Sequence, residues 1–336
     1  VAFHHDVYGS GVLHSNRTGA NLRIITAPLM DEFNIDLVFT GHDHSYARSY
    51  SMLDGTAIKT SSNHLVNPYG TTYVTLGSSS GSKMYGLASP KQYYVKERSN
   101  DLTPTFSTLS VSDDTLLLKT YNSSGKQYSS DFSITKTTDK TNPVSTYQKT
   151  NALKKTSYTK KSFSELQNAL TEFKQKFAPT KTDSGIAKIQ KGYGTSSDPL
   201  TYYGYMLGTT DVLSKGFSTL LDKTRYQGGK AINQTTLTNL TLHLENARNA
   251  LVKTTLVVKK GKKKLKSGQT ISLKKGKKLK LKVTKTPSKY KVTYTSANKK
   301  IVSVSKTGTI KRLKRHSKKT KITVTFQNRK FYLYIK

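Results

Sequence analysis

The chain has 336 residues, a formal net charge of +37, no cysteine and a 34% share of hydrophobic residues. The absence of cysteine excludes a disulfide framework and thiolate metal ligands, and fits a secreted protein that does not depend on disulfides. No apolar run approaches the roughly 18 residues of a membrane helix. The length predicts two or three domains with small cores.

The positive charge is concentrated near the C-terminus. Residues 1–132 carry 10 basic and 11 acidic side chains, residues 133–250 carry 17 and 8, and residues 251–336 carry 29 and none. The first part is therefore close to neutral, and the last part is a candidate for binding polyanions.

Two short apolar runs, at 1–3 and 37–39, each end close to histidine. His4 follows the first run, while His42 and His44 follow the second run and are separated by one residue. A pair of this kind at the end of a strand is a common way to build a metal site, although it also occurs in solvated loops.

The segment between the two runs, 21–33, has apolar residues at helical spacing: Leu22, Ile25, Leu29 and Phe33. Strand, helix and strand in this order form the βαβ pattern, which brings both strand ends to one edge of a parallel sheet. The three histidines are therefore expected to lie together in space.

These residues resemble the calcineurin-like metallophosphoesterases, and within them the purple acid phosphatases. VAFHHDVY at 1–8 is similar to a late histidine motif of that branch, and GHDHSYAR at 41–48 is similar to its last motif. The glycine-rich stretch at 70–81 resembles the strand and turn that follow, and 106–136 resembles the closing strands. The resemblance covers roughly the first 137 residues and implies the C-terminal half of an α/β metallophosphatase sandwich.

The resemblance implies that His4 and His42 bind one metal ion and that His44 binds its neighbour. The metal ions would be divalent or trivalent Fe, Zn or Mn, which lower the pKa of bound water and neutralise charge on phosphate. His14 falls where the family places a histidine that protonates the leaving group, but it also fits a solvated loop histidine.

The other polar residues around the motifs are not expected to bind metal. His5 and Asp43 are expected to point away from the metals, and Asp6 is given no role. Arg48 either contacts phosphate or buttresses the loop through an ion pair.

The family's upstream ligands, a Gly-Asp pair with a bridging aspartate and a Gly-Asn-His stretch, are not found in this sequence. We therefore expect the chain to be the C-terminal portion of a longer protein, with little or no activity by itself. The expected function is hydrolysis of phosphate esters by a secreted phosphatase retained at the cell wall. The alternative is a non-catalytic cell-surface binding or adhesion protein with a decayed phosphatase domain.

The middle of the chain is predicted to be helical. After a linker at 138–149, Ser162 and Glu165 fit a capping box, and two amphipathic patterns in 150–254 resemble the FIVAR modules of Gram-positive surface proteins. The Gly- and Tyr-rich part at 178–234 either fills a core or lines a carbohydrate site.

Seven short alternating segments follow, at 271–273, 279–283, 291–294, 301–304, 309–310, 322–326 and 331–335. Their spacing predicts an all-β sandwich with its lysines facing solvent. The stretches Ser267–Leu273 and Ile301–Ile310 resemble the bacterial Ig-like domain of group 2, expected at 255–336. This implies an extracellular, cell-surface or cell-wall location, with anionic wall polymers as partners. Nucleic acid remains an alternative as a non-specific partner.

Overall fold

The computed structural model describes residues 1–15, 18–137, 142–179 and 229–336. The chain divides into two compact units. Unit 1 comprises Val1–Gln148 and Phe173–Thr241, and unit 2 comprises Lys149–Glu172 and Leu242–Lys336. Within the described residues, no helix is long and apolar enough to cross a membrane. The domain boundaries drawn from the sequence stay predictions.

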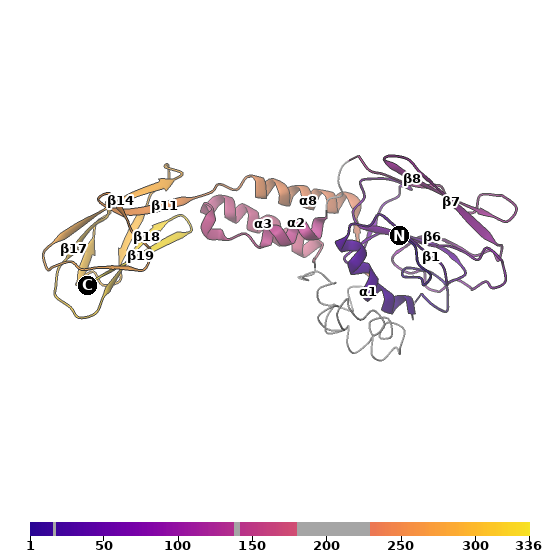
Figure 1. Ribbon diagram of the computed structural model, residues 1–336, viewed down its shortest axis with the longest axis horizontal. Coiled ribbons are helices and arrows are strands. Elements are labelled where there is room, and N and C mark those ends of the chain that lie inside the picture. The colour runs from indigo at the N-terminus through magenta and orange to yellow at the C-terminus, as the bar shows by residue number, and fades with distance from the viewer. Residues whose placement is uncertain (16–17, 138–141, 180–228) are drawn as a thin grey trace. The chain divides into compact units, whose positions relative to one another are not determined.

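The main sheet of unit 1 has six strands: β1 (Leu37–Thr40), β2 (Tyr46–Leu53), β3 (Thr56–Lys59), β5 (Thr71–Thr75), β6 (Val95–Ser99) and β10 (Ala231–Asn233). The strand order is β1-β5-β2-β3-β10, and β6 pairs with β2. Figure 1 labels β1 and β6 of this sheet. The pairs β1–β5 and β10–β3 are parallel, and the other pairs are antiparallel.

The start of the chain runs parallel to β1. The backbone N–H of Phe3 donates to the carbonyl of Phe39 at 3.1 Å, and helix α1 (Thr18–Glu32) connects the two segments. The predicted helix and second strand are therefore present, whereas the predicted first strand is reduced to a single bridge between Ala2 and Phe39. The sequence pattern places Phe33 on the apolar face of this helix. The helix instead ends at Glu32, and the Phe33 side chain is 65% exposed.

A second sheet of unit 1 has the order β4-β9-β8-β7: β4 (His64–Val66), β7 (Thr105–Val111), β8 (Thr115–Asn122) and β9 (Phe132–Thr135). The strands expected between 106 and 136 are thus present. A buried cluster joins the two sheets: Leu37, Tyr46, Val74, Leu118, Phe132 and Ile134.

The opposite face of the main sheet packs against α1. Val38 is the neighbour of Leu37 in β1, and Tyr73 is the neighbour of Val74 in β5. Because neighbouring side chains in a strand alternate, Val38 and Tyr73 point to the other face, where they meet Ala27 of α1. The main sheet is therefore buried on both faces, and all five residues of β5 are buried. These findings show two sheets, with α1 packed on the main one, and the assignment of this part to the metallophosphatase fold remains a prediction.

Among the described residues in the middle of the chain, three segments are α-helical: α2 (Pro143–Asn151), α3 (Lys160–Lys176) and α8 (Gln234–Asn249), with a 3₁₀ turn, η1, at Lys155–Ser157. Much of the predicted linker is thus helical, and Pro143 occupies the first helical position, where a missing N–H is tolerated. The comparison of α3 and α8 with FIVAR modules remains a prediction. The tyrosine cluster expected within 178–234 lies outside the described residues.

Helix α3 begins at Lys160, two residues before Ser162 of the predicted capping box. Thr159 precedes the helix, and its hydroxyl accepts a hydrogen bond from the backbone N–H of Ser162 at 3.4 Å. The Ser162 hydroxyl lies inside the first turn and accepts the N–H of Val252 at 3.1 Å. Thr159 is therefore the capping residue, and the assignment of that role to Ser162 was wrong.

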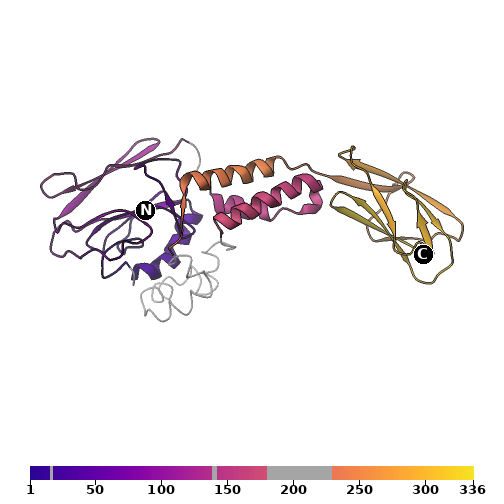
Figure 2. The same cartoon turned by 180° about the vertical axis from the view of Figure 1, so that it is seen from behind.

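The C-terminal part of unit 2 contains two sheets (Figure 2). The first has the order β12-β11-β14-β17-β16 and the second β13-β19-β18-β15. The strands are β11 (Thr255–Lys260), β12 (Lys263–Lys264), β13 (Gln269–Ile271), β14 (Lys278–Thr286), β15 (Thr293–Ser296), β16 (Val302–Val304), β17 (Thr309–Arg312), β18 (Thr320–Phe326) and β19 (Arg329–Ile335). All seven predicted segments lie in or beside these strands, while β11 and β12 were not predicted.

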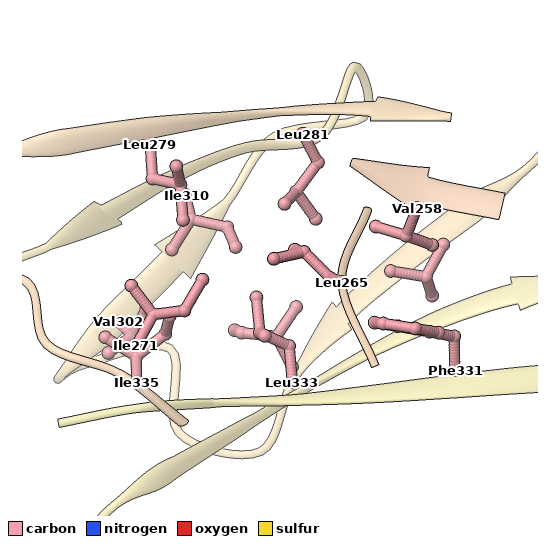
Figure 3. Packing of buried hydrophobic residues seen from close by; sticks show 12 residues of the cluster. Val258, Leu265, Ile271, Leu279, Leu281, Val302, Ile310, Phe331, Leu333 and Ile335 are labelled. Carbon is pink, nitrogen blue, oxygen red and sulfur yellow. The ribbon is translucent and has the colours of Figure 1, made fainter. Parts of the chain in front are cut away.

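Figure 3 shows that side chains from both sheets meet in one apolar core. Along β14, Leu279 and Leu281 are buried, whereas Lys278, Lys280 and Lys282 are exposed. The alternation that predicted the strands therefore also places the lysines on the solvent face.

Candidate metal centre

Four imidazole rings lie together beyond the end of β1. Nε2 of His4 and Nδ1 of His42 are 3.2 Å apart. The ring centroid of His42 lies 4.1 Å from that of His14 and 4.4 Å from that of His5. The structure therefore brings together three of the four predicted site residues: His4, His14 and His42. All four rings are exposed or half-buried and reachable from solvent.

His5 was expected to point away from this site, and that expectation was wrong. In a continuous strand, neighbouring side chains alternate between faces, so His4 and His5 would separate. The first segment bridges β1 only at Ala2, and the chain bends at residues 4 and 5. The rings of His4 and His5 consequently stay close, with centroids 5.2 Å apart.

The second histidine pair lies in an unusual backbone conformation. His42 has φ 66° and His44 has φ 45°, both in the left-handed region that residues with a Cβ rarely adopt. Such positions cost on the order of 1–3 kcal/mol each and are concentrated at functional sites. The loop must therefore be held in place by contacts elsewhere.

Asp43, between these histidines, supplies that anchor. Its side chain is fully buried, and Oδ2 accepts hydrogen bonds from the backbone N–H groups of Ser10, at 2.9 Å, and Gly11. The Ser15 hydroxyl also donates to Oδ2, at 3.2 Å. Asp43 therefore faces the turn at residues 9–15, and its role is to fix the loop that carries His42 and His44.

The loop that holds Asp43 requires glycine for close approach. A Cβ added at Gly9 would lie 2.6 Å from Asp43 Oδ2 and 2.7 Å from Asp6 Oδ2. The two carboxyl groups are therefore packed directly under the backbone of this turn. The same turn leads into His14, so its position also sets that of the candidate acid.

Arg23 of α1 ties this loop to the rest of unit 1. Its side chain is 3% exposed, and the guanidinium donates to the carbonyls of Val7 at 2.5 Å and Ser15 at 2.6 Å. A third hydrogen bond, at 2.6 Å, reaches the hydroxyl of Tyr94. Sequence reasoning missed this residue, and the only signal was one arginine within an amphipathic helix.

The buried carboxyl groups and the imidazoles have perturbed proton affinities. Burial, followed by repulsion from Asp43, raises the pKa of Asp6 to about 7, and Arg23 opposes this shift. Burial, followed by the neighbouring imidazoles, lowers the pKa of His42 to about 4, and the pKa of His5 is lowered for the same reasons. His42 is therefore neutral at pH 7, the form in which imidazole binds metal.

His44 stands apart from the four clustered rings. Its Nδ1 lies 2.9 Å from the carbonyl oxygen of Lys83, and its ring packs on Tyr85 at a centroid distance of 5.0 Å. Tyr85 also contacts His14, at 5.5 Å, so it links His44 to the cluster. Tyr85 was not predicted, because it comes from a distant loop without a motif of its own.

The side chains of this cluster are of a type that binds metal ions, but their arrangement does not form a metal site. Imidazole in its neutral form is a suitable ligand for Zn, Fe and related ions, and five histidine rings lie in or beside the cluster. Within the ranges that the structure describes, no three His, Asp or Glu side chains have the arrangement needed to hold a metal ion. The site residues therefore remain a prediction.

Arg48 has the buttressing role rather than a phosphate contact. Its side chain is 2% exposed, pairs with Glu97 at 2.8 Å and donates to the Asn63 side chain at 3.0 Å. The guanidinium also lies over the Phe132 ring, 4.5 Å from its centroid. These contacts connect β2, β6 and β9 and leave Arg48 buried away from solvent.

No curated protein matches the chain. Among solved structures, purple acid phosphatase PPD1 from yellow lupin (Lupinus luteus) seeds matches with a TM-score of 0.31 and 20% sequence identity, over 40% of this chain and 24% of the phosphatase. The chain thus spans about a quarter of that protein. Residues 262–334 match the family model of the bacterial Ig-like domain (group 2), a type typical of extracellular bacterial surface proteins. Residues 262–334 therefore form a bacterial Ig-like domain of group 2, as the sequence predicted.

Proposed function

We propose that this chain supplies the histidine-bearing part of a dinuclear metal centre that hydrolyses phosphate esters. In this proposal His4 and His42 bind one metal ion, and His44 binds the second. The observation that carries the proposal is the 3.2 Å approach of the His4 and His42 ring nitrogens, which come from positions 38 residues apart. Their motifs are the two that resemble the purple acid phosphatases.

The surrounding residues have roles that follow from their contacts. Asp43 and Arg23 hold the two loops in register, so that the ring nitrogens of His4 and His42 face each other before any ligand binds. His14, packed on His42, is placed to donate a proton to a leaving group. Two bound metal ions would supply an activated water and neutralise the charge of the phosphoryl oxygens.

The proposal includes low activity for this polypeptide by itself. By family resemblance, a bridging aspartate and an asparagine–histidine stretch complete the donor set, and the sequence contains neither motif. We expect this chain to bind Zn²⁺ or Mn²⁺ but to hydrolyse a chromogenic phosphomonoester little or not at all. Metal-dependent hydrolysis that is lost in His42→Ala would contradict this part of the proposal.

Metal binding tests the centre directly. Titration calorimetry of the whole chain with Zn²⁺ should show binding that His42→Ala weakens by at least about tenfold, since one of few ligands is removed. His64→Ala is the matched control, because His64 lies in unit 1 and bonds the Ser133 hydroxyl at 2.9 Å, outside the cluster. Equal losses in both variants, or no binding by the wild type, would refute the proposed centre.

The location of the protein is a second part of the proposal. We propose an extracellular protein retained at a bacterial cell wall by electrostatic attraction between its basic Ig-like domain and anionic wall polymers. Helices α3 and α8 would then belong to a FIVAR-like module. Retention of the whole chain on isolated walls should fall steeply between low and high salt, because exposed charges are screened. Retention that does not change with salt would refute it.

If metal binding fails while salt-sensitive retention holds, the alternative of a non-catalytic surface protein is favoured. The two measurements therefore separate the two candidate functions.

A further inference from the structure

An open cavity of about 810 Å³ lies at one end of the Ig-like domain. Seven residues line it, and we call it the basic groove: Lys274, Lys275, Lys277, Arg312, Arg315, His316 and Ser317. Five of them carry a permanent positive charge, and residues 251–336 contain no Asp or Glu side chain to neutralise them. Its volume is within the roughly 300–1,000 Å³ of small-ligand sites.

The groove is held together by Arg312. Its guanidinium donates to the carbonyls of Leu273 at 3.0 Å, His316 at 3.1 Å and Lys314 at 3.2 Å. The first carbonyl precedes the turn that carries the three lysines, and the other two belong to the loop after β17. One side chain therefore fixes both walls, which distinguishes the groove from lysines scattered over a sheet face.

We propose that the basic groove is a binding site for consecutive phosphate groups of a linear phosphodiester polymer of the cell wall. This inference rests on the proposed retention at the wall and assigns it to one site. Arg315 supplies paired N–H donors suited to phosphate oxygens, and the lysines supply point charges around them.

The lining favours a wall polymer over nucleic acid. Sites that bind single-stranded nucleic acid combine basic side chains with aromatic rings on which the bases stack. The groove has no Tyr, Phe or Trp among its lining residues, and His316 is its only ring. Its side chains therefore recognise the phosphate groups and offer little to a base.

The test compares two triple variants of the whole chain with the same net charge. The groove variant is Lys274→Gln, Lys275→Gln and Lys277→Gln. The control is Lys289→Gln, Lys291→Gln and Lys330→Gln, which changes exposed lysines at the opposite end of β14 and β18. A third variant, Arg312→Lys, keeps the charge but cannot make the same three bonds. Thermal unfolding checks that each variant is folded.

The probe is synthetic poly(glycerol phosphate), with single-stranded DNA and polyglutamate of equal charge as comparators. We expect the groove variant to bind the probe about 10- to 100-fold more weakly than the control variant, with a shallower dependence on salt. Arg312→Lys should also weaken binding, although the net charge is unchanged.

The outcomes separate this inference from the proposed retention. If the wild type binds the probe and the two triple variants lose affinity equally, retention stands and the groove is refuted. If the wild type does not bind, both fail. Tighter groove-dependent binding of DNA would assign the site to nucleic acid instead, and equal groove-dependent binding of polyglutamate would overturn recognition of phosphate.

Discussion

Replacing Arg23 with methionine should release the loop that carries His14. Methionine keeps an unbranched apolar stem but removes the guanidinium that bonds the carbonyls of Val7 and Ser15 and the hydroxyl of Tyr94. The guanidinium carbon also lies 4.4 Å from the centroid of the Tyr94 ring, so a cation–π contact is lost as well.

The magnitude follows from the buried groups left without a donor. An unsatisfied buried carbonyl costs about 1–3 kcal/mol, and the variant leaves two of them. The Tyr94 hydroxyl still donates to the carbonyl of Gly9 at 2.8 Å, so the loss of its contact with Arg23 costs less free energy. The expected total is about 3–5 kcal/mol, a large part of the roughly 5–15 kcal/mol that stabilises a typical domain.

Hydrogen exchange is the suitable assay, because the damage should be local. The amides of Ser10 and Gly11 bond Asp43, and that of Val12 bonds the Gly86 carbonyl at 2.9 Å. A local cost of about 3 kcal/mol corresponds to roughly 100-fold faster exchange at these amides.

Arg48→Met is the matched control for this experiment. Arg48 is as buried as Arg23, but it pairs with Glu97 and lies over Phe132 on the other side of the main sheet. It should destabilise unit 1 without selectively exposing the amides of residues 10–12. Unchanged exchange at these amides in Arg23→Met, or equal acceleration in both variants, would show that Arg23 does not hold the loop.

Three further substitutions test individual contacts. Gly11→Ala places a methyl group against the Asp43 carboxylate and should weaken Zn²⁺ binding in calorimetry; unchanged affinity would deny the anchoring role of Asp43. Leu333→Ala opens the Ig-like core and should cost about 2–5 kcal/mol in thermal unfolding, whereas the 50% exposed Leu242→Ala should change stability little. Thr159→Ala should cost about 1 kcal/mol through loss of the α3 cap, measured by the same assay; no change would show that the Thr159 hydroxyl does not stabilise the start of α3.

The strands of the Ig-like domain could be predicted because their signal is local. Alternation along β14 and β18 sets inward and outward side chains from the chain itself, whatever the partner strand. Strand β12 escaped prediction because it consists of two lysines, and β11 was missed although it contains the apolar run Leu256–Val258. The place of β11 is set by pairing with a distant segment, as in Val258 opposite Val283, and β12 then pairs back onto β11.

The candidate site could be predicted in part, because its histidine motifs are also local features of the sequence. The motifs around His4 and His42 and the order strand, helix, strand were sufficient to expect their approach, because parallel neighbours end at one edge. The position of His5 was missed, because a bend after a single bridge cancels the alternation of a strand. His44 packs on Tyr85, a residue 41 positions away that no local pattern connects to it.

The sequence by itself determined the histidine motifs, the uneven distribution of charge and the alternation of the C-terminal strands. Only the tertiary structure decided that Asp43 anchors the histidine loop, that Arg23 clamps its neighbour and that Arg312 builds the basic groove. Each of these three side chains bonds backbone groups of another loop or element. Such contacts depend on how the chain returns on itself, which periodicity along the sequence does not encode.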